Sequence, residues 1–592
     1  MGEFEMIDTL SKWVEKAYRW VMFFFSAGIL TLFVCYKLIA TSVLVRWEHA
    51  IHIQNSIMPC LIGLILLLAA GFLFASSKAY PFLSGKLKDD RFYFMMRRGL
   101  LFGIFLISAG WVICTQFVPG VDEGETMHYA YLAYQGNFDQ FRSGGYLQRY
   151  PNQWGLFLLE YLMIRIFGGQ NYLAFELFNA FAIVAIVYEL SEIARINGSG
   201  RLVEVGVMLL GLLFLPLEFY AIYVYGNIFS MAFALAAVKN QMLFTRNLKI
   251  RNASLCAVEI SLAVWLKSTI EIYLVAIVIY AVVDILVNRR NGLWKRVLFL
   301  VLVAAAFYLQ SAGTRAVIQK MTGMELSNPI SMVSYVAMGL QEAEAGPGWW
   351  NGYNRESYYA SGNNTELQTQ MALDNIRESV RVFCQSPGYA LSFFTRKITS
   401  TWMNPTFQCF ATVRNNVFIY LPEWVQNLLT YGGQYSISKY LNVLLFLIYT
   451  GSLADIVYLY IHREYTERSI LIMAFVGGVV FLLFWETKAR YALMFLVCLF
   501  PYAVDGYRRI ICTLLCLSQR IRAKEKLSFR VLQRKRCAFP CVIISLVVVL
   551  FLIVYAPRYS KILTPDTANY VEYLVTHGKD SVVPDIVKTK YS

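Results

Sequence analysis

The chain has 592 residues, of which 58% are hydrophobic and only 15% are charged, and its mean hydropathy is +0.50. A soluble globular protein carries about 25% charged residues, so this composition excludes that class. The formal net charge of +15 is compatible with nucleic-acid binding until its distribution along the chain is considered.

The apolar residues occur in blocks and predict an all-α polytopic integral membrane protein with about 13 transmembrane helices. Residues 57–76 and 99–118, for example, are near-continuous apolar runs long enough to cross a hydrocarbon core of about 30 Å. The predicted spans are residues 19–45, 57–76, 99–118, 172–194, 202–222, 225–244, 252–267, 269–288, 296–312, 438–461, 468–485, 490–507 and 541–557. The acidic N-terminus and its long first apolar run predict no cleavable signal peptide.

Lys and Arg in the short loops predict the orientation, because they are enriched on the cytoplasmic side. The loops of one face (77–98, 195–201, 239–251, 288–296, 462–468 and 508–538) hold 28, whereas those of the other face hold four. The N-terminus is therefore expected in the cytoplasm, with the long loops and the C-terminus outside the cell membrane. The basic excess then faces anionic membrane lipids, which argues against a nucleic-acid partner.

This topology divides the chain into five parts. Residues 1–98 form two N-terminal transmembrane helices and a basic cytoplasmic loop, and residues 99–312 form a transmembrane core that includes the first outer loop, 119–171. Residues 313–437 form a long outer loop. Residues 438–557 form the C-terminal transmembrane helices with the basic loop 508–538, and residues 558–592 form an outer tail. The cysteines form no CxxC pair or zinc pattern. Cys384 and Cys409 share the long outer loop, and the sequence leaves open whether they pair.

The first outer loop begins with a pair of carboxylates, Asp122 and Glu123, directly after a predicted span. The lower dielectric near the membrane makes a carboxylate a stronger base, although solvated loop residues are the simpler interpretation. Residues 154–167 are apolar but too few to span, which predicts a helix lying in the interface.

The second outer loop contains an aromatic segment at residues 346–354, including Trp349 and Trp350. These rings are suited to stacking on a sugar, and packing against neighbouring helices explains them equally well. Residues 364–382 predict a capped, mostly polar helix. Arg396 and Lys397 follow among aromatic residues and are suited either to a lipid phosphate or to anchoring a helix at the headgroups.

Two short turns on the same predicted face carry charges between apolar helices. Lys267 lies in the first, and the second contains Glu486, Lys488 and Arg490. Charge near the bilayer is costly and usually has a partner or a function, but side chains that reach the interface explain each turn taken alone. Together with Asp122 and Glu123, these cations predict a site for a lipid-borne phosphate and a reacting hydroxyl.

The order of these motifs resembles the GT-C glycosyltransferases, specifically the bacterial dolichyl-phosphate-mannose protein mannosyltransferase-like branch (glycosyltransferase family 39). The resemblance covers residues 99–510 and rests on five landmarks. They are Asp122-Glu123 with Tyr129, Tyr150-Pro151 with Gly155, Leu266-Lys267-Ser268-Thr269, Phe394–Lys397 with Trp402–Pro405, and Glu486 with Arg490-Tyr491. The chain departs from the family pattern by two additional spans before the acidic loop and by a second outer loop without a recognisable domain.

The resemblance implies transfer of a hexosyl or pentosyl group from a polyprenyl-phosphate-sugar donor, with inversion. Asp122 or Glu123 is expected to act as the general base. Lys267 and Arg490, with Lys488, Arg396 and Lys397 as further candidates, are expected to bind the donor phosphate. Substrate contacts are expected from His128, Tyr129, Trp349, Trp350, Glu486 and Tyr491. No cofactor is certain; a divalent metal ion at Asp122 is compatible with the sequence.

The sequence leaves the acceptor open among a glycan of the cell envelope, a cell-wall polymer, a protein and a lipid. Two other functions remain as alternatives. A polysaccharide polymerase or ligase also uses a polyprenyl-linked donor and a large outer loop. A lipid-linked glycan transporter would favour broken or ionisable segments in corresponding positions of two halves, whereas the charges here gather at the outer ends of the spans, with Glu176 and Glu218 interpreted as residues near the interface.

Overall fold

A computed structural model describes residues 2–45, 49–411, 421–463, 468–522, 544, 546–548 and 550–557. The predicted outer tail 558–592 lies outside the described residues, as does the part of the basic loop beyond residue 522. The predicted span 541–557 is covered only in part.

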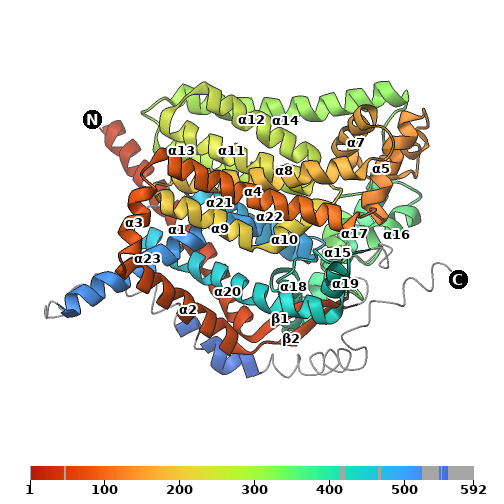
Figure 1. The fold of residues 1–592 in the computed structure, drawn as a ribbon. Helices are drawn as coiled ribbons and strands as arrows, with labels where there is room; N and C mark the ends of the chain where they lie inside the picture. The colour runs from red at the N-terminus through yellow and green to blue at the C-terminus, as the bar shows by residue number, and fades with distance from the viewer. Residues whose placement is uncertain are drawn as a thin grey trace.

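Long apolar helices form the body of the molecule and run roughly parallel across the view of Figure 1. They are α1 Gly2–Ile39, α2 Ile57–Ser76, α4 Asp90–Thr115, α8 Tyr172–Ile196, α9 Arg201–Leu213 with α10 Leu215–Phe219 and η3 Tyr220–Ile222, α11 Asn227–Asn247, α12 Ile250–Leu266, η4 Ser268–Ile270 with α13 Glu271–Val287, α14 Leu293–Thr322, α20 Tyr431–His462, α21 Ser469–Phe484, and α22 Ala489–Leu496 with η7 Val497–Leu499 and α23 Phe500–Arg522.

Among the described residues, nine helices are long and apolar enough to cross a membrane, and the bent pair of α9 with α10 and η3, at 57°, brings the number to ten. α12 and α21, with 17 and 16 residues, are shorter helices at two further predicted positions. A π-helical turn, η9 Phe551–Tyr555, lies within the last predicted span. The chain is therefore a polytopic α-helical membrane protein, and the number thirteen stays a prediction.

The first predicted span, residues 19–45, is too long at its C-terminal end. α1 ends at Ile39, and β1 Ala40–Val45 pairs with β2 His49–Gln54 in an antiparallel hairpin, with Val43 opposite Ile51. The β-branched residues of both strands favour this conformation over a helix. The hairpin packs on the long outer loop, because the Ala50 N–H donates to the Ala345 carbonyl at 2.8 Å.

The remaining helices lie at the two ends of the long ones. The short α3 Ala79–Lys86 follows α2. The first outer loop forms α5 Val121–Tyr134, η1 Asp139–Phe141, α6 Tyr146–Arg149, η2 Pro151–Gln153 and α7 Trp154–Phe167. The second forms α15 Val333–Gly339, α16 Tyr353–Ala360, α17 Thr365–Gln385, α18 Pro387–Trp402 and α19 Glu423–Leu429.

Both long loops lie at the same end of the molecule, the right end in Figure 1, which we call the loop end. They also contact each other. Gln148 Nε2 donates to the Asn328 carbonyl at 2.6 Å, and the Ile330 N–H donates to the Arg149 carbonyl at 3.1 Å. Residues more than 170 positions apart in the sequence therefore form one assembly at this end.

Two elements expected in these loops are confirmed. α7 is a helix over residues 154–167, as the apolar segment predicts. α17 begins at its predicted cap, where the Asn364 side chain accepts a hydrogen bond from the Leu367 N–H. Cys384, at the end of α17, is an exposed free thiol and Cys409 is a buried one, so the structure has no disulfide between them.

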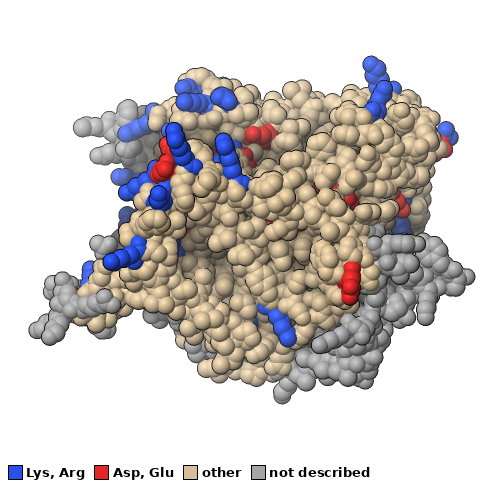
Figure 2. Space-filling model, in the orientation of Figure 1, with Lys and Arg blue, Asp and Glu red and all other residues tan. Residues whose placement is uncertain are grey.

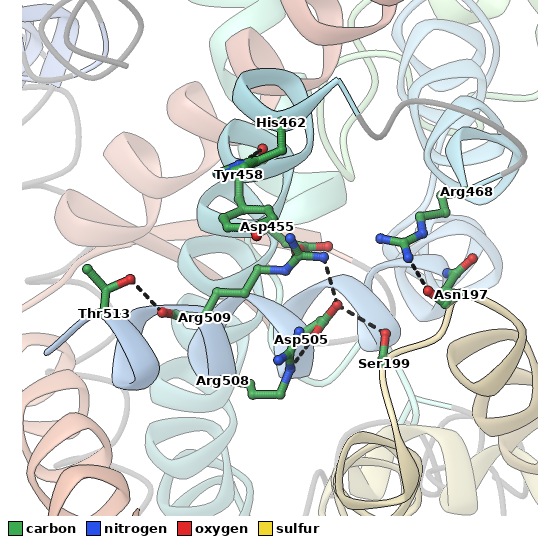
Figure 3. A network of polar contacts seen from close by, with 10 residues as sticks. All are labelled: Asn197, Ser199, Asp455, Tyr458, His462, Arg468, Asp505, Arg508, Arg509 and Thr513. Carbon is green, nitrogen blue, oxygen red and sulfur yellow. Dashed lines mark hydrogen bonds and ion pairs between the residues drawn. The ribbon is translucent and has the colours of Figure 1, made fainter. Parts of the chain in front are cut away.

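Lys and Arg side chains gather at the opposite end on the face drawn in Figure 2, and we call this the basic end. Here Figure 3 shows a polar network between α20 and α23. Arg509 pairs with Asp455 at 2.7 Å and donates to Asp505 at 3.1 Å, and Asp505 also accepts from Ser199 Oγ at 3.0 Å. The network satisfies buried charges and joins the connection between α8 and α9 to the C-terminal helices.

Candidate functional site

The two carboxylates of the first outer loop lie in the first turn of α5. Asp122 is exposed, whereas Glu123 is 8% exposed. Negative charge is favourable at this position because the N–H groups of a helix N-terminus are unpaired and carry partial positive charge. The short distance between the end of α4 and the start of α5 keeps both carboxylates beside the helical bundle.

Lys267 lies in the turn between α12 and η4, with an extended backbone at φ −154°. Two glycines, one in α7 and one directly before α11, press against this turn. A Cβ atom on Gly155 of α7 would overlap the Trp265 carbonyl oxygen, and one on Gly226 would overlap the Leu266 carbonyl oxygen. The two glycines therefore allow the close backbone approach that fixes the position of Lys267.

The Lys267 ammonium is half-buried, and its Nζ lies 4.4 Å from the centre of the Tyr225 ring. Burial lowers the pKa of Lys267 to about 8; the charge of Arg490 also lowers it, and the carboxylates of Glu486 and Asp122 oppose the shift. Lys267 thus lies within electrostatic range of a carboxylate from the first outer loop and of the charged turn before α22.

The turn before α22 is held by the second outer loop through backbone hydrogen bonds. The Glu486 N–H donates to the Tyr335 carbonyl at 3.1 Å, and the Thr487 N–H donates to the Gly348 carbonyl at 2.8 Å. The Tyr335 ring stacks on Trp485 with ring centres 5.2 Å apart. The second outer loop therefore sets the path of the chain that leads to Arg490.

Arg490 connects this turn to the carboxylates of α5. Its Nη1 lies 3.9 Å from Glu123 Oε1, and its guanidinium lies 5.7 Å from the centre of the Tyr223 ring. Its backbone N–H donates to Gln408 Oε1 at 3.0 Å. Two cations and two carboxylates from three separate parts of the chain therefore converge at the loop end.

Several tyrosines lie within electrostatic range of Asp122. Burial raises the pKa values of Tyr146, Tyr225 and Tyr335 well above the ordinary value, and the nearby Asp122 carboxylate adds to each shift. These phenols stay protonated and can donate hydrogen bonds to an oxygen-rich ligand. Gln153 Nε2 donates to the Tyr225 hydroxyl, which orients this ring beside Lys267.

The structure does not bring all the predicted phosphate ligands together. Lys397 is buried and donates to the Gly339 carbonyl at 2.5 Å and to the Trp485 carbonyl at 2.8 Å. Burial lowers its pKa to about 7, with Glu486 opposing the shift. Arg396 instead pairs with Glu342 at 2.5 Å on the surface of the second loop. Lys397 thus supports the turn, and Arg396 is held by a carboxylate outside the cluster.

The remaining residues of the same turn are close to the cluster. Glu486 and Lys488 are 6% and 9% exposed. Lys267 Nζ lies 5.9 Å from the centre of the Tyr491 ring. Glu486, Lys488 and Tyr491 therefore belong to the same region as Lys267.

The predicted substrate contacts differ in their surroundings. Trp349 is fully buried and its Nε1 donates to Ser400 Oγ at 3.1 Å, so it packs inside the second loop, whereas Trp350 is 45% exposed. Tyr129 packs on Tyr146 with ring centres 5.4 Å apart. His128 is exposed, with Nδ1 3.1 Å from Gln170 Nε2.

Several residues of the cluster were not singled out by sequence reasoning. Tyr225 follows a run rich in tyrosine that reads as part of a span, and Tyr146 and Tyr335 lie in segments without a distinctive pattern. Arg149 and Arg355, from different loops, act electrostatically on Tyr150 beside Asp122. Only tertiary structure joins these positions.

In the part of the chain that the structure describes, no group of three or more His, Cys, Asp and Glu residues is arranged to hold a metal ion.

The fold and this site define a polytopic membrane protein with a cluster of carboxylates, cations and tyrosines at its loop end. Comparisons with models of protein families, with curated proteins and with solved structures find no match.

Proposed function

We propose that the chain is a GT-C-type glycosyltransferase that moves a hexosyl or pentosyl group from a polyprenyl-phosphate donor to an acceptor hydroxyl. The observation that carries this proposal is the convergence of Asp122 with Lys267 and the ion pair of Arg490 with Glu123. One anionic group suited to accept a proton thus lies beside two cations suited to a phosphate. A donor carried by a lipid reaches such a site from the bilayer, so no nucleotide-binding domain is required.

In the proposed reaction, Asp122 is the general base. It is exposed, whereas Glu123 is mostly buried and paired with Arg490. The carboxylate of Asp122 accepts the proton of the acceptor hydroxyl as the hydroxyl oxygen attacks the anomeric carbon. The bond from that carbon to the donor phosphate oxygen breaks on the opposite face, so the configuration inverts and polyprenyl phosphate leaves.

The two cations act on the leaving group. Negative charge grows on the phosphate oxygen as its bond breaks, and a preorganised cation is worth more here than in water. Arg490 suits two phosphate oxygens at once, and Lys267 acts as a point charge. The pairing of Arg490 with Glu123 holds the guanidinium in place before the donor arrives.

The proposal includes the full topology. We propose thirteen spans, a cytoplasmic N-terminus and a loop end outside the cell membrane. The support is the gathering of Lys and Arg at the opposite end, which corresponds to the cytoplasmic side in multi-pass proteins. The reaction then takes place at the outer face.

The test is transfer of a radiolabelled sugar by the full chain in lipid nanodiscs supplied with synthetic polyprenyl-phosphate sugars. The Asp122→Asn variant is expected to lose at least 100-fold in transfer rate, since removal of a general base typically costs about 10²–10⁴-fold, and to keep donor affinity within about threefold. Asp139→Asn is the matched control, because Asp139 is also an exposed carboxylate of the same loop but is paired with Arg142 at 3.0 Å. Normal turnover by Asp122→Asn refutes the base assignment, and absence of donor binding by the wild type refutes the proposed function.

One observation favours a transporter as the second candidate. The bend of 57° between α9 and α10 lies at Phe214, and Pro216 is in the first turn of α10. Broken spans of this kind are common at transport sites. Transport predicts that the lipid-linked sugar crosses a liposome membrane unchanged. Transfer without crossing excludes this alternative.

A further inference from the structure

A second pair of cations, Arg149 at the end of α6 and Arg355 of α16, acts on residues that Asp122 also affects. Both act on the same two neighbours. Burial raises the pKa of Glu125, and the carboxylate of Asp122 adds to this shift, while Arg149 and Arg355 oppose it. The two guanidinium groups oppose in the same way the burial that raises the pKa of Tyr150 to about 12. The two arginines, from different outer loops, therefore share one neighbourhood.

Aromatic rings support each guanidinium. Arg149 lies 5.3 Å from the centre of the Tyr150 ring and 5.5 Å from that of Tyr359, and Arg355 lies 5.6 Å from that of Trp350. A guanidinium placed over an aromatic ring is oriented by it while its N–H edges stay available to an anion. Tyr359 and Trp350 are 50% and 45% exposed, so part of each residue is open to contact with a ligand.

These two arginines differ from four of the others in the outer loops. Arg142, Arg377, Arg381 and Arg396 each form an ion pair with an aspartate or glutamate. Within the described ranges, no carboxylate lies within 4.0 Å of a charged nitrogen of Arg149 or Arg355. A solvated arginine is common on a surface, but two of them from separate loops, each on an aromatic ring and both acting on the same neighbours as the candidate base, form an arrangement suited to an anion.

The pair is distinct from the cations proposed to bind the donor phosphate. The charges that act on Lys267 are those of Arg490, Glu486 and Asp122. The charges that act on Tyr150 include Arg149, Arg355 and again Asp122. Asp122 is therefore the carboxylate that both groups of cations have in common. In an inverting transfer the acceptor oxygen attacks the anomeric carbon from the face opposite the leaving phosphate, so the acceptor and the donor phosphate need separate binding groups.

We propose that Arg149 and Arg355 bind the acceptor, and that the acceptor is an anionic glycan whose sugar carries a carboxylate or a phosphate. The inference rests on the proposed function and names its acceptor class. The anionic group binds the two guanidinium edges, and a sugar ring packs on the exposed faces of Tyr359 and Trp350. A hydroxyl of that sugar then reaches Asp122 and gives up its proton as its oxygen attacks the donor.

The experiment uses the full chain in nanodiscs, a polyprenyl-phosphate sugar that the wild type accepts, and four acceptors. They are a neutral tetrasaccharide, tetragalacturonate, a phosphorylated tetrasaccharide and an acidic tetrapeptide that contains serine. We expect the KM of one of the two anionic glycans to be at least tenfold below that of the neutral one, and the preferred anion identifies carboxylate or phosphate. Raising the salt concentration from 50 to 500 mM should weaken this preference.

The variants separate the subsite from the chemistry. Arg149→Gln and Arg355→Gln should each raise the KM for the preferred glycan about tenfold and the KM for the neutral one less than twofold, with kcat retained. Arg381→Gln is the matched control, since Arg381 is an exposed arginine of the loop end that is paired with Glu378 at 2.8 Å. Direct binding of the glycan to the inactive Asp122→Asn variant, measured by calorimetry, gives a readout without turnover. When Arg149→Gln or Arg355→Gln is added to Asp122→Asn, the affinity for the glycan should fall, and by the same factor for both.

The outcomes distinguish the two proposals. If the donor is used in an Asp122-dependent reaction but neutral and anionic glycans have equal KM values, the acceptor inference is wrong and the proposed function stands. Preference for the acidic peptide overturns the assignment of a sugar. If no donor binds, the proposed function fails, and the inference about its acceptor fails with it.

Discussion

The close approach of α7 to the Lys267 turn can be tested with one methyl group. In Gly155→Ala the new Cβ would overlap the Trp265 carbonyl oxygen and would lie 2.6 Å from its carbonyl carbon and 2.9 Å from Cδ1 of its ring. The backbone contact cannot be relieved by a side-chain rotation. α7 or the turn must therefore shift by more than about 1 Å, and overpacking of this kind costs about 1–3 kcal/mol.

The control is Gly110→Ala in α4, where a Cβ meets nothing within 4 Å. Alanine is favoured over glycine inside a helix by roughly 0.5–1 kcal/mol, so this variant should be as stable as the wild type or more so. The two variants add the same methyl group, and only the first presses on the turn that carries Lys267. The free energy of unfolding in detergent should therefore fall only for Gly155→Ala.

The same shift should affect activity. A displacement of about 1 Å at a reacting centre can cost about 100-fold in rate, so sugar transfer by Gly155→Ala should fall by tenfold or more at temperatures where the protein stays folded. Equal stability of the two alanine variants, together with full transfer by Gly155→Ala, refutes the argument that this glycine positions Lys267.

Four further substitutions separate structural residues from ligand contacts in the second outer loop. Lys397→Met should lower the free energy of unfolding by about 1–3 kcal/mol, because two buried carbonyls lose their donor; unchanged stability contradicts the supporting role. Arg396→Gln breaks an exposed pair with Glu342, so stability should change by less than about 1 kcal/mol and the donor Kd by less than twofold, and a tenfold loss of donor affinity restores Arg396 as a phosphate ligand. Trp349→Ala should cost about 3–5 kcal/mol, whereas Trp350→Ala should leave stability within about 0.5 kcal/mol and weaken only acceptor use; the reverse order contradicts their assigned surroundings.

The sequence predicts most of the helices because the length of an apolar run is a local property that the bilayer fixes. The same rule is wrong at residues 40–45, where apolar residues continue past Ile39 but form a strand. The strand exists because β2 and the Met403 carbonyl lie beside it. Neither partner can be identified from the run itself.

The residues of the candidate site can likewise be predicted only in part from the sequence. Lys267 and Arg490 can be assigned to one face with Asp122, because alternation of spans places every second turn on the same side. The role of Lys397 cannot be predicted, since it depends on a contact with the Trp485 carbonyl, 88 positions away in the sequence. The burial of Trp349 cannot be predicted from the sequence either, because Trp349 and Trp350 are adjacent residues of the same type, yet one is buried and the other is exposed.

The pH dependence of donor binding tests the charge state of Lys267 itself. Its pKa is lowered to about 8, so the ammonium is protonated at pH 7 and mostly neutral at pH 9. A polyprenyl-phosphate sugar is a phosphodiester with one negative charge throughout this range, so the donor does not titrate. Binding the anion favours the protonated lysine, and the donor Kd should therefore rise as the pH rises through 8.

The magnitude follows from the fraction protonated. With a pKa of about 8, this fraction falls about tenfold from pH 7 to pH 9, so the donor Kd should be about tenfold larger at pH 9 than at pH 7. Lys267→Arg keeps the positive charge but does not titrate in this range, so its donor Kd should change less than twofold. Because Lys397 remains in that variant, any contribution from its own titration also remains. A wild-type Kd that is flat between pH 7 and pH 9, or an equal slope in Lys267→Arg, shows that Lys267 does not bind the phosphate as an ammonium.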